Sequence, residues 1–133
     1  MSADGTVVRH FSPIIDHKIE DKNGYFELIR KGLVAVVNEK HGTGSAARLK
    51  EITVAGKTGT AQVVHLKKMP SELEDEIPYK YRDHAWFVCF APAEDPQIAI
   101  AVVIEHGGHG GSAAGPVAKS VLMRYFGLDG ETK

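Results

Sequence analysis

The sequence predicts an α+β fold in which an antiparallel sheet of at least three strands is flanked by helices. Apolar residues recur at helical spacing in one segment near each end of the chain. Between these segments lie three runs rich in β-branched and apolar residues, and the last two, 85–91 and 97–105, flank a Pro-containing connection typical of a β-hairpin. The expected order is therefore helix, strand, long loop, hairpin and helix, within one domain of 133 residues.

The first helix is expected over residues 24–40. Asn23 is a candidate N-cap, and Gly42 and Gly44 mark the end of the helix. The segment predicts an amphipathic helix, because its large apolar residues fall on one face. These residues are Phe26, Ile29, Leu33, Val36 and Val37.

The second helix is expected over residues 115–126. Pro116 suits its first turn, where a missing N–H removes no helical hydrogen bond, and Gly127 suits its end. The apolar stripe that would face the core consists of Val117, Val121 and Tyr125.

The first strand is expected within residues 52–64, which are rich in β-branched side chains. Its glycines, Gly56 and Gly59, leave room for another group to approach closely. The polar stretch 65–83, with an acidic cluster at 72–76, predicts a long and solvated surface loop.

The two hairpin strands are apolar without alternation, so we expect both faces of the sheet to be covered. The chain offers only two helices for this purpose, and helical cover for one face is therefore expected to be incomplete. Near the N-terminus, residues 6–20 predict short extended pieces at a sheet edge.

The composition excludes several classes of protein. With 43% hydrophobic and 25% charged residues, the chain has the profile of a soluble globular domain. A formal net charge of −1 favours neither nucleic acid nor an anionic membrane, so no nucleic-acid partner is expected. The longest apolar run, 98–104, is far shorter than the ~20 residues of a membrane span, and no secretory signal is expected. The single Cys89 excludes an internal disulfide, and its apolar surroundings predict a buried side chain.

Two glycine-containing motifs point weakly to nucleotides. Gly56-Lys57-Thr58 matches the end of a phosphate-binding loop, but Glu51 stands where that loop needs its first glycine, and the motif continues as strand-like sequence. Residues 108–113 fit a dinucleotide-binding fingerprint, but no further strand follows to contact a ribose. We therefore expect these glycines to turn the chain from a central strand into the C-terminal helix.

The segment Lys57-Thr58-Gly59-Thr60 is the strongest candidate site. Alternation along a strand places Lys57 and Gly59 on one face and the two threonines on the other, unless the glycines bend the strand. The lysine supplies a long-reach positive charge, the threonines supply hydroxyl donors, and the glycine removes a Cβ that would block a ligand. Such a strand edge suits a carboxylate and a polarised carbonyl, whereas the structural alternative is an edge strand with a solvated lysine.

Further blocks extend this motif in a specific order and spacing: 54–63, 82–87, 90–92 and 102–108. Together they resemble the C-terminal half of penicillin-binding protein transpeptidase domains, in particular those of the class B, elongation-type penicillin-binding protein 2. The resemblance implies a partial β-lactamase-like fold, with an antiparallel sheet between helical layers. Because it spans nearly the whole chain, residues 1–133 are expected to be a single fragment, the C-terminal portion of such a domain.

The resemblance implies a serine-type D,D-transpeptidase, without a cofactor, that cross-links peptidoglycan stem peptides and is trapped by β-lactams. Lys57 would orient the substrate, the hydroxyls of Thr58 and Thr60 would hold its carboxylate beside Gly59, and the Thr60 N–H would form half of an oxyanion hole. Of the family's three motifs, only Lys-Thr-Gly is present, because no serine of the chain begins Ser-x-x-Lys or Ser-x-Asn. The fragment alone is therefore expected to be inactive.

The resemblance also implies a parent protein anchored in the bacterial inner membrane, with its catalytic domain in the periplasm beside cell-elongation proteins. The fragment itself is expected to be soluble and to self-associate through apolar sheet surface. An alternative stays open: a noncatalytic module that binds a peptide C-terminus along the same strand edge.

Histidines near the second glycine motif suggest a metal site at Glu105, His106 and His109. The surrounding glycines give imidazole ligands a poor frame, so no metal is expected. His84 and Trp86 are expected to pack and to form hydrogen bonds rather than to act as acid–base groups.

Overall fold

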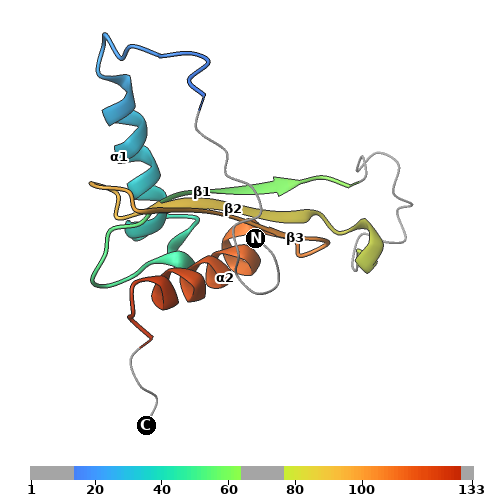
Figure 1. The fold of residues 1–133 in the computed structure, drawn as a ribbon. Helices are drawn as coiled ribbons and strands as arrows, with labels where there is room; N and C mark the ends of the chain where they lie inside the picture. The colour runs from blue at the N-terminus through green and yellow to red at the C-terminus, as the bar shows by residue number, and fades with distance from the viewer. Residues whose placement is uncertain (1–13, 64–76, 130–133) are drawn as a thin grey trace, which may run out of the picture.

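The computed structural model describes residues 14–63 and 77–129, and in this part of the chain it confirms the predicted order of elements (Figure 1). The α+β class is also confirmed, since the described residues form a three-stranded antiparallel sheet and two α-helices. The elements are α1 (Tyr25–Asn38), the 3₁₀ turn η1 (Ser45–Ala47), β1 (Ala55–Ala61), the 3₁₀ turn η4 (Tyr79–Tyr81), β2 (His84–Ala91), β3 (Ile98–Ile104) and α2 (Gly110–Tyr125).

The sheet has the order β1-β2-β3, and both strand pairs are antiparallel. β2 and β3 form the predicted hairpin, in which the Gln97 N–H donates to the Ala91 carbonyl at 3.0 Å and the Ala91–Pro92 peptide bond is cis. The strand before the C-terminal glycines was expected to be central. It is β3, which lies at an edge of the described sheet because β2 pairs on both sides.

The core lies between the sheet and α2. Alternation along β2 sends every second side chain to the face that α2 covers, and all of these are buried: Ala85, Phe87, Cys89 and Ala91. From α2, the side chains of Ala114, Ala118 and Leu122 join the same cluster. Small residues on the inner side of the helix therefore allow close approach to the sheet.

α2 begins earlier than predicted and buries a different stripe. It starts at Gly110, so Pro116 lies inside the helix rather than in its first turn. The stripe that was expected to face the core is instead 44%, 44% and 53% exposed at Val117, Val121 and Tyr125. The buried face of the helix instead carries mainly small side chains. The prediction relied on the spacing of large apolar residues and therefore assigned the buried face to the wrong side of the helix. Gly127, with φ of 66°, ends the helix as predicted.

α1 has nearly the predicted extent but a different N-terminal cap. Gly24, with φ of 70°, turns the chain just before the helix. The Asp21 carboxylate then accepts hydrogen bonds from the backbone N–H groups of Tyr25 at 2.7 Å and Phe26 at 2.9 Å. Asp21, and not the predicted Asn23, therefore satisfies the first free amides of the helix.

α1 rises from the sheet on the side opposite α2 (Figure 1). Its C-terminal end packs into the molecule through the buried Val37, and the Asn38 side-chain amide donates to the Val54 carbonyl at 2.7 Å. Arg30 connects the middle of the helix to the hairpin by donating to the Ala93 carbonyl at 3.2 Å. The N-terminal half projects from the sheet, and its apolar side chains are exposed: Tyr25, Phe26, Leu28 and Ile29.

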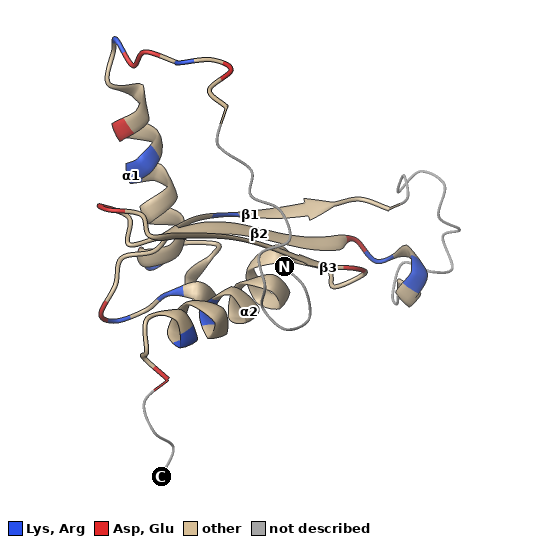
Figure 2. Cartoon of the chain, in the orientation of Figure 1, with Lys and Arg blue, Asp and Glu red and all other residues tan. Residues whose placement is uncertain are grey.

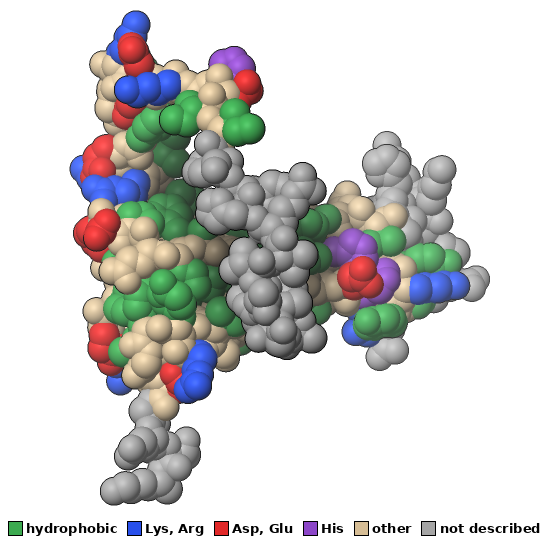
Figure 3. Space-filling view, in the orientation of Figure 1, with side chains coloured by type: hydrophobic (Ala, Val, Ile, Leu, Met, Phe, Trp, Pro, Cys, Tyr) green, Lys and Arg blue, Asp and Glu red, His purple; other side chains and the backbone are tan. Residues whose placement is uncertain are grey.

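The sheet face opposite α2 is only partly covered. Trp86, Val88 and Val103 point to this face and are 42%, 45% and 45% exposed. The expectation that both faces are covered is therefore wrong for the described residues, because α1 meets the sheet near one end only. The incomplete helical cover expected for one face is confirmed, and Figure 3 shows hydrophobic side chains exposed along α1 and below it.

The prediction of short extended pieces at a sheet edge over residues 6–20 is wrong for the residues of this segment that the structure describes. Residues 14–20 form no strand, and Ile14, Ile15 and Ile19 are exposed. Residues 6–13 and the acidic cluster at 72–76 lie outside the described residues. Within the described ranges, none of the helices has the length and apolar character that a membrane crossing requires.

Candidate functional site

The candidate motif lies on an edge strand that carries a single formal charge. Within the described residues β1 pairs with β2 alone, which leaves its other edge open. Lys57 is the only Lys, Arg, Asp or Glu of the three strands, and Figure 2 shows how few charged positions the sheet has. Among the described residues, no carboxylate forms an ion pair with this ammonium group.

The strand register places the four motif residues as simple alternation requires. Lys57 and Gly59 lie on the partly open face, and Thr58 and Thr60 lie on the face that α2 covers. Lys57 and Thr60 are exposed, while Thr58 and Gly59 are half-buried. The glycines therefore do not disturb the alternation of β1.

Thr58 is the fixed point of the motif. The Lys57 ammonium donates to the Thr58 carbonyl at 2.7 Å, which folds the lysine back along its own strand. The Thr58 hydroxyl lies 3.0 Å from the hydroxyl of Thr43, in the loop between α1 and η1. Among the described residues the Thr60 hydroxyl has no hydrogen-bond partner. The site thus presents one constrained hydroxyl, one free hydroxyl and an ammonium group beside an open strand edge.

The first turn of α2 lies directly against the backbone of the motif strand. A Cβ at Gly110 would overlap the carbonyl oxygen of Trp86 and would lie 2.5 Å from that of Gly59. A Cβ at Gly59 would in turn lie 3.2 Å from the Cβ of Trp86. The glycines after β3 were expected only to turn the chain, but Gly110 also permits this contact between helix and strand.

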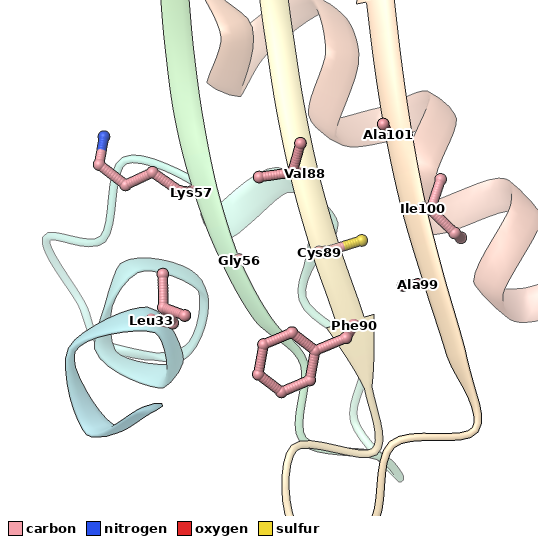
Figure 4. A pocket seen from close by; sticks show the side chains of 9 residues that line it. All are labelled: Leu33, Gly56, Lys57, Val88, Cys89, Phe90, Ala99, Ile100 and Ala101. Atoms are coloured by element: carbon pink, nitrogen blue, oxygen red, sulfur yellow. The ribbon is translucent and has the colours of Figure 1, made fainter. Parts of the chain in front are cut away.

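An open apolar trough adjoins Lys57 on the partly covered side of the sheet. It has a volume of about 450 Å³, and Figure 4 shows Leu33 of α1 facing Phe90 across it, with Lys57 at its rim. The strands contribute small and apolar side chains to its floor, among them Val88, Ala99 and Ala101. The charge of Lys57 therefore sits between an apolar hollow and the open edge of β1.

The remaining candidates lack the geometry that their chemistry needs. Lys57 lies within a strand and opens no helix, unlike the lysine of a phosphate-binding loop. The His106 N–H donates to His84 Nδ1 at 2.8 Å, so His84 has the hydrogen-bonding role that was expected. In the described ranges no three His, Cys, Asp or Glu side chains form a group that could hold a metal ion.

Cys89 is buried, as predicted, in the core beneath α2. Burial raises the pKa of its thiol to about 11, because the interior disfavours the charged thiolate. A cysteine in this state is a packing residue rather than a nucleophile.

A family model with the description "Penicillin binding protein transpeptidase domain" matches residues 3–123. The chain belongs to this transpeptidase family. The family was therefore correctly identified from the Lys57–Thr60 motif and the blocks around it.

Peptidoglycan D,D-transpeptidase MrdA of Haemophilus influenzae is 38% identical over 102 residues, which cover 76% of this chain and 16% of that protein. The corresponding protein of Acinetobacter baumannii is 44% identical over 94 residues, which cover 71% of this chain and 14% of that protein. The chain thus spans less than a fifth of these relatives.

Solved structures of the family share the fold. The PBP2 of Pseudomonas aeruginosa in complex with WCK 5153 is 35% identical with a TM-score of 0.62, over 81% of this chain and 20% of that one. The PBP2 of Helicobacter pylori in complex with MreC is 36% identical with a TM-score of 0.58, over 77% of this chain and 17% of that one. The described sheet and helices are therefore a fragment of the transpeptidase fold.

Two features of the site were missed from the sequence. Thr43 contacts Thr58 although the two residues are far apart in the chain. Gly110 and Gly111 bring α2 against β1 and against the loop that contains Thr43. A threonine between two glycines, in Gly42-Thr43-Gly44, was the only available signal, and by itself it indicates no more than a tight loop.

Proposed function

We propose that this chain forms the Lys-Thr-Gly part of a serine-type peptidoglycan D,D-transpeptidase, which cross-links stem peptides by acyl transfer. The observation that carries the proposal is the placement of Lys57, Thr58, Gly59 and Thr60 on an open strand edge, in a chain whose family match spans nearly its full length. The names of the MrdA relatives, which are peptidoglycan D,D-transpeptidases, support the same reaction.

Each motif residue has a task that its position supports. Lys57 attracts and orients the anionic stem peptide, because its ammonium group is the one charge of the three strands. Thr58 and Thr60 donate hydroxyl hydrogen bonds to the substrate carboxylate, and Gly59 keeps the strand surface accessible. The backbone N–H of Thr60 stabilises the oxyanion that forms when the scissile carbonyl is attacked.

The nucleophile has to come from outside these 133 residues, since no serine here begins a Ser-x-x-Lys motif. The proposal therefore includes a parent protein that supplies this serine and a Ser-x-Asn motif, and that acts outside the cytoplasm on a membrane anchor. Stem peptides and β-lactams are its ligands, and proteins of the cell-elongation machinery are its partners. The complex between the PBP2 of Helicobacter pylori and MreC supports such a partner class.

A fluorescent penicillin tests the proposal directly. The complete protein that contains this segment should become covalently labelled, whereas the 133-residue chain alone should stay unlabelled. Lys57→Ala in the complete protein should slow labelling by at least tenfold, because a charge-assisted contact to the substrate is worth about 1.5–3 kcal/mol. Ser45→Ala is the matched control, since the exposed Ser45 has no side-chain hydrogen bond among the described residues.

Stable covalent labelling of the isolated chain would contradict the assignment of the nucleophile to another segment. A complete protein that binds peptides with a free C-terminus, yet never forms an acyl-enzyme, would instead favour the noncatalytic binding module. The upstream coding sequence distinguishes the same two functions, because only the enzyme requires Ser-x-x-Lys.

A further inference from the structure

The loop that follows α1 is held tightly against the end of that helix. The Gly44 N–H donates to the Val36 carbonyl at 2.9 Å, and the Gly42 N–H donates to the Glu39 carbonyl at 3.1 Å. A Cβ at Gly42 would overlap the Val36 carbonyl oxygen, so only glycine lets the loop lie this close. Thr43, between the two glycines, therefore occupies a fixed position rather than the tip of a free loop.

Thr43 connects this loop to two other elements of the site. Its carbonyl oxygen lies where a Cβ at Gly111 would be, so the first turn of α2 packs directly on the Thr43 backbone. Its hydroxyl lies 3.0 Å from the Thr58 hydroxyl of β1. The Thr43 side chain therefore contacts the motif strand although it lies outside the motif, and its position is fixed by contacts with the end of α1 and the first turn of α2.

A hydroxyl has one proton to donate and lone pairs that accept, so the partner of Thr58 decides where its proton points. When Thr43 donates to Thr58, the proton of Thr58 stays free for an external acceptor. The Lys57 ammonium already binds the Thr58 carbonyl at 2.7 Å, which adds a second restraint on the same residue. The Thr60 hydroxyl has no such partner among the described residues and stays free to rotate.

We propose that Thr43 is a positioning residue for the transpeptidase site: its hydroxyl donates to Thr58 and directs the Thr58 proton towards the carboxylate of the bound substrate. This inference rests on the proposed function, because it takes the carboxylate contact of Thr58 from that reaction. It adds to the site a residue from outside the Lys-Thr-Gly motif. It also gives a role to the hydroxyl of Thr43, because the tight loop itself requires only the two flanking glycines.

The test measures acylation rates of the complete protein with a β-lactam and with the same compound methylated on its carboxylate. Thr43→Ala should slow acylation by the free acid about fivefold, which corresponds to one neutral hydrogen bond, and should leave the rate with the methyl ester unchanged. Thr43→Ser retains the hydroxyl and should restore most of the rate. Ser45→Ala, two residues away, should leave both rates at the wild-type value.

A double substitution separates positioning from a general structural effect. If Thr43 acts through Thr58, Thr43→Ala should slow the reaction no further in a Thr58→Ala background. Equal slowing with the acid and the ester, or equal rates for wild type and Thr43→Ala, would overturn the inference while leaving the proposed function intact. If the wild-type complete protein is not acylated at all, the proposed function itself fails, and this inference fails with it.

Discussion

Gly110→Ala tests the contact between α2 and the motif strand. In an open environment, replacing a helical glycine by alanine stabilises a protein by up to about 1 kcal/mol. At Gly110 the new Cβ would overlap the Trp86 carbonyl oxygen and would lie 2.5 Å from the Gly59 carbonyl oxygen, so backbone has to move. Overpacking of this kind costs about 1–3 kcal/mol, so once the helical gain is subtracted the net result should be a loss of stability of up to about 2 kcal/mol.

Gly32→Ala is the matched control, because Gly32 lies in the middle of α1 with no atom within 4 Å of its added Cβ. It should raise the stability by about 0.5–1 kcal/mol. Urea unfolding of both variants at one protein concentration measures the difference. Amide chemical shifts of Thr58, Gly59 and Thr60 should change in Gly110→Ala and stay constant in Gly32→Ala. Equal stabilisation by both substitutions would refute the close approach of α2 to β1.

Three further predictions concern the α1 cap, Cys89 and the exposed apolar surface. Asp21→Ala should lower the stability by about 1 kcal/mol and speed amide exchange in the first turn of α1, while Asn23→Ala should leave both unchanged. A thiol reagent should label Cys89 slowly at neutral pH and faster as the pH approaches about 11, because only the thiolate reacts. The pKa of the unfolded thiol is about 9, so the folded state keeps the thiol proton to higher pH. The stability contributed by Cys89 should therefore fall as the pH rises from about 9 through about 11, and a pH-independent unfolding free energy in this window would contradict its burial. The isolated chain should self-associate through the uncovered sheet face and the exposed α2 stripe, and a monodisperse monomer in light scattering that binds no hydrophobic dye would count against this.

Much of the fold could be read from the sequence because the signals were local. The hairpin followed from two apolar runs around a Pro-containing connection, and the first helix followed from its apolar spacing. The buried face of α2 could not be found in this way. Its inner side consists of Ala114 and Ala118 with Leu122, and small residues carry no signal until the distance between helix and sheet is known.

The candidate site shows the same division. The alternation of Lys57 to Thr60 along β1 followed from strand geometry, since side chains on any strand alternate. The contact of Thr58 with Thr43 could not be predicted in this way, because it depends on the path of the chain from α1 back to the sheet. The cap at Asp21 was missed for a related reason: the left-handed Gly24 brings a carboxylate from four residues before the helix into reach.

The one-sided pairing of β1 has a consequence for its amide groups. In an antiparallel pair, successive residues of a strand alternately direct their N–H and C=O groups to the neighbour and away from it. With β2 on one side only, every second amide of β1 therefore lacks a strand partner among the described residues. Deuterium uptake along Ala55–Ala61 should consequently alternate between slow and fast from one residue to the next, and an extended ligand that docks on this strand would protect the fast set alone.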